Sequence, residues 1–210
     1  KAGATGSEDL RNVTGVAVDG PDATLRNLTV TVEGDNSFQK SDTDINGIEV
    51  RAANTTITDT TVERDAPPDE SRGVLVDATA TDVTVTELTL IEAELEMNGT
   101  DGTARNLRVT APDIGGPSVD IWGHRTTVEN VRITEDNGLR GGGTGVEVRN
   151  VTVDAADTSL SSVAAVPGTD GSINGLTVVS GGQVVGTKVS GTDVTIRNAT
   201  FKTRDTTVPT

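Results

Sequence analysis

Val-Arg-Asn-Val-Thr-Val, residues 148–153, is one of nine copies of a short pattern in the chain. Each copy places one apolar residue two positions before an anchor residue, and most copies place others one and three positions after it. The anchors lie about 23 residues apart on average, which is a period typical of solenoid proteins. They are residues 12, 27, 59, 87, 106, 130, 150, 175 and 198, and most of them are asparagine.

The spacing of the apolar residues predicts a bend at the anchor. They fall out of step with the two-residue period of a strand, so one straight strand cannot bury all of them. Asparagine tolerates the left-handed backbone that such a bend needs, and its amide can bond to the asparagine of the next coil. We therefore expect a structural ladder of anchor side chains. Its predicted members are Asn27, Asn106, Asn130, Asn150 and Asn198.

Several repeats carry an earlier short strand that follows a small residue, as in Gly47–Val50, Gly73–Val76 and Ser118–Ile121. A strand, a turn, a second strand, an asparagine bend and a third strand make one coil. This order resembles the repeats of the right-handed parallel β-helix (pectate-lyase-like) family over roughly residues 8 to 202. The resemblance implies an all-β solenoid of about nine coils. Helical spacing of Leu88, Ile91 and Leu95 is a rival local interpretation, but the repeat favours strand there.

The composition fits a thin core and an acidic surface. Aromatic residues are 1% of the chain, so burial must come from aliphatic side chains stacked layer on layer. A net charge of −15 disfavours nucleic acid and anionic membranes as partners. No apolar stretch approaches the length of a membrane span, so membrane insertion is not expected. Without cysteine the chain forms neither disulfides nor thiolate metal sites.

The acidic residues are mainly Asp, and Arg outnumbers Lys. With the abundant Thr and Val, this composition resembles surface proteins of halophilic archaea or of their viruses, and implies an extracellular, cell-surface or virion-surface location. Residues 1–210 read as a single β-helix domain with no obvious cap at either end. We expect a segment of a longer chain or a larger assembly, in which other copies or domains are partners.

Six Asn-X-Ser/Thr sequons are potential glycosylation sites. Four of them, at Asn12, Asn27, Asn150 and Asn198, coincide with anchors, where the coil already requires Asn and Thr. Asn54 and Asn98 lie off the anchors and are the better candidates for carrying a glycan.

Aligning the earlier strands places Glu49, Leu75, Glu96 and Asp120 in one outward column. Many β-helix enzymes cleave polysaccharides with clustered carboxylates, often beside a histidine. The first two residues of Gly123–Arg125 resemble the Gly-His-Gly of polygalacturonase-like hydrolases, but no paired Asp-Asp motif accompanies them. The alternative function is therefore catalysis by Glu96, Asp120 and His124.

The same column is also what any strongly acidic surface would present, and His124 fits a role in a turn. Trp122 is the candidate for stacking on a sugar ring if it is exposed. No cofactor or metal site is predicted, although calcium could bind at Asp-Gly turns such as that at Asp101. We favour a non-enzymatic structural or recognition module of an extracellular surface, fibre or spike protein, with a role in adhesion or in host or glycan binding. A polysaccharide hydrolase or lyase is the alternative.

Overall fold

The strands of this protein stack into a parallel β-solenoid, as the repeat predicts. The computed structural model describes residues 13–33, 45–64, 71–110, 117–134, 138–155, 164–166, 168–180, 187–189 and 191–203. These residues form strands, turns and bends, and none of them is helical. The helical interpretation of residues 87–97 is wrong, because this stretch supplies strands β7 and β8.

Two parallel sheets form the walls of the solenoid. The first contains β1 (Val13–Val18), β4 (Ile45–Val50), β6 (Ser71–Val76), β8 (Leu95–Met97), β10 (Val119–Ile121), β12 (Leu139–Gly141), β14 (Ala164–Val166) and β16 (Thr187–Val189). The second contains β2 (Thr24–Arg26), β3 (Thr29–Val32), β5 (Thr56–Arg64), β7 (Thr84–Ile91), β9 (Thr103–Thr110), β11 (Thr127–Thr134), β13 (Glu147–Ala155), β15 (Ser172–Ser180) and β17 (Thr195–Thr203).

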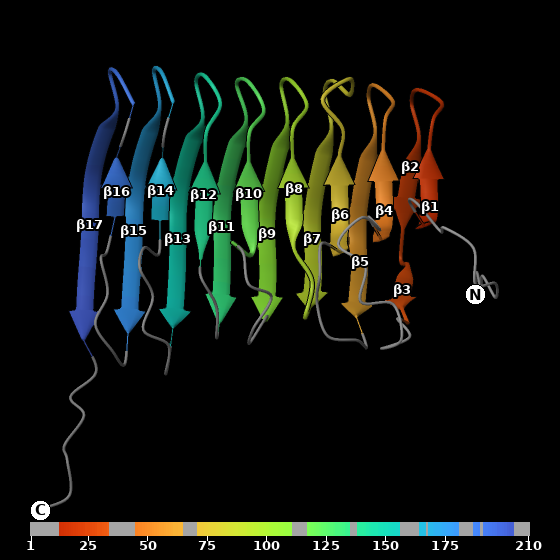
Figure 1. Ribbon diagram of the computed structural model, residues 1–210, viewed down its shortest axis with the longest axis horizontal. Coiled ribbons are helices and arrows are strands. Elements are labelled where there is room, and N and C mark those ends of the chain that lie inside the picture. Colours follow the sequence, from red (N-terminus) through yellow and green to blue (C-terminus); the bar gives the residue numbers. More distant parts are fainter. Residues whose placement is uncertain are drawn as a thin grey trace, which may run out of the picture.

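The coils follow one another along the long axis, with the N-terminal coil at one end and the C-terminal coil at the other (Figure 1). Among the described residues the first sheet is eight strands deep, so the expected nine coils are too many. The first copy of the pattern explains this difference. The anchor Asn12 lies outside the described residues, but the residues that follow it form β1 in the first sheet rather than a second-sheet strand.

The second-sheet strands bend where the pattern predicts. In β11 the apolar side chains of Val128, Val131 and Ile133 are all buried, while Asn130 between them is exposed. This needs one residue of left-handed backbone, which turns the chain so that both flanks face inward. The described anchors all have positive φ: Asn27 53°, Asp59 50°, Glu87 55°, Asn106 57°, Asn130 56°, Asn150 50°, Gly175 81° and Asn198 54°.

A second set of left-handed residues, which the repeat did not reveal, lies between each first-sheet strand and the following second-sheet strand. The backbone amides of all but the last of them bond to carbonyls of the next coil, as from Asp101 to His124 and from Arg125 to Thr144. The members are Asp22, Asn54, Asp82, Asp101, Arg125, Gly145, Asp170 and Asp193.

Glycines stack beside these turns because neighbouring coils approach too closely for a side chain. A Cβ on Gly143 would lie 1.7 Å from the carbonyl oxygen of Gly123, and one on Gly123 would lie 2.0 Å from that of Gly99. Gly168 and Gly191 continue the stack with equally short contacts. Between the two sheets lies a single core of aliphatic side chains, which includes Ile48, Leu90, Leu95, Ile121 and Leu176.

Candidate functional site

The outward column predicted on the first sheet exists in the structure. Strand pairing places Glu49 beside Leu75, Leu75 beside Glu96, and Glu96 beside Asp120. The next residue in the column is Arg140, which pairs with Asp120. Because the strands are parallel and in register, side chains from segments 20 or more residues apart become neighbours.

Glu94 is a further outward carboxylate beside this column, and it was not predicted. It lies just before β8, and its backbone carbonyl accepts hydrogen bonds from the amides of Gly73 and Val74. Arg72 lies between the two carboxylates, because its Nε forms an ion pair with Glu96 and lies 3.8 Å from Oε1 of Glu94. The alternating sequence Ala93–Met97, which turns two glutamates outward on one strand, was the available signal.

Arg140 links the carboxylates to the only tryptophan of the chain. Its Nε donates to Oδ1 of Asp120 at 2.9 Å and a terminal nitrogen donates to Oδ2, so the pair is bidentate. Its guanidinium carbon also lies 5.2 Å from the ring centroid of Trp122, a cation–π distance. Trp122 remains 44% exposed, and stacking on a sugar ring requires an exposed indole ring.

The carboxylates differ in accessibility, and the pKa of Glu94 is shifted. The exposed fraction of the side chain falls from 21% for Glu94 to 15% for Glu96 and 7% for Asp120. Burial, and next the nearby charge of Glu96, raise the pKa of Glu94 to about 7 against the opposing effect of Arg72. Near neutral pH, Glu94 therefore carries a proton in part of the molecules, beside two carboxylates held by arginines.

His124 does not join this cluster in the structure. It lies in the turn after β10, where it forms an isolated parallel β-bridge with Thr100. Its Nδ1 accepts a hydrogen bond of 3.4 Å from the backbone amide of Thr144 in the next coil. This placement agrees with a turn role. The catalytic assignment of Glu96, Asp120 and His124 stays a prediction, with the histidine facing the turn.

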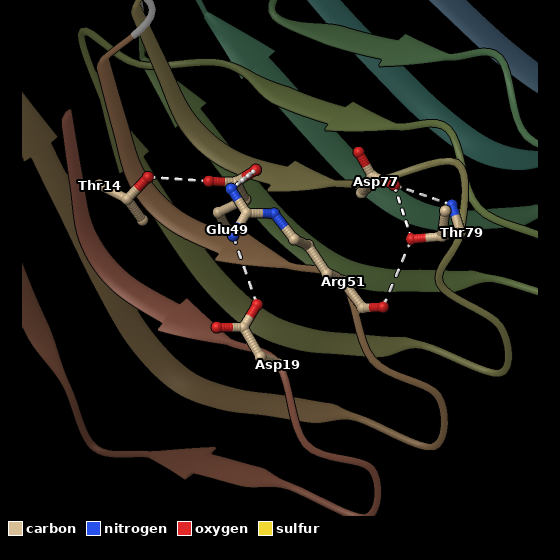
Figure 2. Close-up of polar contacts among 6 residues, drawn as sticks. All are labelled: Thr14, Asp19, Glu49, Arg51, Asp77 and Thr79. Atoms are coloured by element: carbon tan, nitrogen blue, oxygen red, sulfur yellow. Dashed lines mark hydrogen bonds and ion pairs between the residues drawn. The ribbon is translucent and has the colours of Figure 1, made fainter. Parts of the chain in front are cut away.

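A polar network ties the first coils together at the N-terminal end of the same column (Figure 2). Arg51 forms ion pairs with Glu49 at 2.7 Å and with Asp19 at 3.3 Å, and Glu49 accepts a hydrogen bond from Thr14 at 2.8 Å. Glu49 is buried, so this network satisfies an acid that would otherwise destabilise the coil. Asp77 caps the following turn by accepting bonds from Thr79, which lower the pKa of Asp77. This network is structural.

The asparagine ladder forms over three successive coils. Nδ2 of Asn130 donates to Oδ1 of Asn106 at 3.2 Å, and Nδ2 of Asn150 donates to Oδ1 of Asn130 at 3.3 Å. Gly175 interrupts it, and Asn198 bonds instead to Asn174. Earlier in the stack the acids Asp59 and Glu87 share a hydrogen bond, which raises the pKa of Glu87.

The side-chain amides of two sequon asparagines donate hydrogen bonds to carboxylates. Nδ2 of Asn54 donates to Oδ1 of Asp22 at 3.0 Å, and Nδ2 of Asn98 donates to Oε1 of Glu96 at 2.6 Å. Asn54 occupies one of the left-handed turn positions, and Asn98 borders the carboxylate cluster. Glycosylation of either residue stays a prediction.

Within the ranges that the structure describes, no group of three or more acidic, histidine or cysteine side chains is arranged to hold a metal ion. A helix long and apolar enough to cross a membrane is also lacking from these ranges. Neither the protein-family models nor the curated proteins contain a match to the chain.

Proposed function

We propose that this protein is a non-enzymatic glycan-recognition module of an extracellular surface, fibre or spike structure in a saline environment. The observation that carries the proposal is the contact between Trp122, Arg140 and Asp120. An exposed indole ring beside an arginine that a carboxylate holds in place is a rigid apolar platform edged with hydrogen-bonding groups.

The stacking of the coils extends this platform into a row. Asp120 and Glu96 follow Arg140 along the first sheet at the spacing of neighbouring strands, and Glu94 lies just before Glu96 in the same coil. Arg72 and Arg140 hold these carboxylates in place, so little side-chain entropy is lost when a ligand binds beside them. A linear glycan lying along the solenoid axis would meet successive polar groups in order. The net charge of −15 supports a setting of high ionic strength.

Hydrolysis is the second candidate, because the raised pKa of Glu94 is suited to a proton donor beside two other carboxylates. The ion pairs of Glu96 with Arg72 and of Asp120 with Arg140 disfavour hydrolysis. A base must be free to accept a proton from water or sugar, whereas Glu96 and Asp120 are each held by an arginine and largely covered. We therefore place recognition first.

Binding to an array of neutral and acidic glycans, at physiological and at molar salt, tests the proposal. We expect at least one glycan to bind, and Trp122→Ala to weaken its affinity by roughly tenfold, since aromatic contacts contribute about 1 kcal/mol beyond burial. Trp122→Phe should retain part of the affinity. If no glycan binds, or if Trp122→Ala binds as the wild type does, the proposal is wrong.

Measurement of new reducing ends separates the two candidates. Recognition without catalysis predicts that the bound glycan stays intact over days. Cleavage that Glu94→Gln abolishes, while binding remains, would establish the hydrolase instead.

A further inference from the structure

The two ends of the solenoid expose residues that the middle coils bury. At the C-terminal end, β17 leaves Ile196 39% exposed and Phe201 51% exposed, although equivalent residues of β15 are buried. At the N-terminal end, Leu25 and Val30 pack against the core but are only partly covered. Among the described residues, no strand pairs with the outer edge of β17 or with that of β2 and β3.

The same seven-residue pattern stands at both ends. Residues 195–201 read Thr-Ile-Arg-Asn-Ala-Thr-Phe, and residues 24–30 read Thr-Leu-Arg-Asn-Leu-Thr-Val. Both place an asparagine of left-handed backbone at the fourth position, with φ of 54° at Asn198 and 53° at Asn27. The two edges therefore share the bend, the strand direction and the positions of inward side chains.

From this match we propose that copies of this protein stack end to end, with β17 of one copy paired in parallel with β2 and β3 of the next. In the register used throughout the chain, Ile196 would cover Leu25, Ala199 would cover Leu28, and Phe201 would cover Val30. The alanine leaves room for the leucine, as it does where Ala199 already lies beside Leu176. Such a head-to-tail contact does not close on itself, so it produces a linear fibre.

The charges at the junction make the contact depend on salt. The register brings Arg197 beside Arg26 and Asp193 beside Asp22, and these four side chains are exposed. The two like charges within each pair repel each other, and molar salt screens that repulsion. The fibre is therefore expected to form in molar salt and to weaken at low salt. This inference does not depend on glycan binding, so either proposal can fail alone.

Sedimentation velocity of the full chain over a range of concentrations and salt tests it. We expect oligomers that grow with concentration in molar salt, and none at low salt. Phe201→Glu should abolish growth, since it places a charge in the C-terminal contact. Thr200→Glu, which changes an outward position of the same strand, should not.

Mixing variants tests the head-to-tail geometry. Leu28→Glu blocks the opposite end, and Thr29→Pro is a second variant that removes an edge amide, because the ladder to β5 uses the carbonyl of Leu28. Either one, mixed with Phe201→Glu, leaves one intact end on each partner and should give a dimer and nothing larger. Circular dichroism checks that each variant is folded.

Three results would overturn the proposal: a wild type that is monomeric at every salt concentration, a mixture that gives no dimer, or equal effects of Phe201→Glu and Thr200→Glu. A monomer that grows only after removal of residues 1–12 or 204–210 would show that the chain covers its own ends, and it would also overturn the proposal.

Discussion

Arg140 and Asp120 face each other on neighbouring strands of the first sheet and form a bidentate ion pair, with one of its two bonds 2.9 Å long. The side chain of Asp120 is only 7% exposed, whereas that of Arg140 is 44% exposed. The arginine thus neutralises an almost buried acid and at the same time lies beside the ring of Trp122.

Loss of Arg140 should therefore destabilise the protein as well as weaken glycan binding. We expect Arg140→Gln to lower the free energy of unfolding by about 1–3 kcal/mol, because a covered carboxylate loses its charged partner. Urea denaturation in molar salt measures the change. Arg149→Gln is the control, since its ion pair with Glu147 is exposed and should contribute less than about 0.5 kcal/mol. Equal effects would mean that the covered pair has no special role.

The stability of the protein should fall as the pH rises from about 5 to 8. The pKa of Glu94 is about 7 in the folded chain, above its ordinary value of 4.5, so the folded state binds the proton more tightly. That stabilisation is complete below the unfolded pKa and is lost as the pH passes the folded pKa. It amounts to at most about 3 kcal/mol.

Glu94→Gln should flatten this dependence, and unfolding in urea at several pH values measures it. Leu75→Gln, at a neighbouring outward position, leaves Glu94 in place and should keep the slope of the wild type. A slope that persists in Glu94→Gln would assign the titration to another group.

Replacement of Gly143 should disrupt the stacking of the coils. An added Cβ would lie 1.7 Å from the carbonyl oxygen of Gly123, so backbone must move. We expect Gly143→Ala to cost about 2–4 kcal/mol, measured as a fall in the midpoint of thermal unfolding. Gly20→Ala is the matched control, because nothing lies within 4 Å of its added Cβ. If both variants melt together, the close approach of the coils at Gly143 does not limit stability.

Two substitutions at Asn130 separate the backbone role of the ladder from its hydrogen bonds. Asn130→Gly keeps the left-handed conformation and loses the side-chain hydrogen bonds to Asn106 and Asn150. Asn130→Ala loses both, so it should be less stable than the glycine variant by about 1 kcal/mol. Thermal unfolding gives the order. An alanine variant as stable as the glycine variant would show that the bend carries no strain.

The local rules of the chain were enough to predict the bends and the outward column. Where the apolar residues leave the two-residue period of a strand, an anchor residue with left-handed backbone lets the residues on both sides of it face inward. Every described anchor adopts this left-handed conformation. The register of Glu49, Leu75, Glu96 and Asp120 followed from the same periodicity. The number of coils was overestimated, since the pattern near Asn12 leads into a first-sheet strand.

The tertiary structure alone decided which of these groups interact. Glu94 meets Arg72 and Glu96, and Arg140 meets Trp122, because coils of unequal length bring distant residues to the same place on the sheet. The stack of glycines also emerged only there, since close approach is a property of two coils and not of one repeat. Local periodicity determines the conformation of each residue and the direction of its side chain. Ion pairs, burial and the resulting pKa of Glu94 depend on long-range neighbours, which a repeat pattern does not specify.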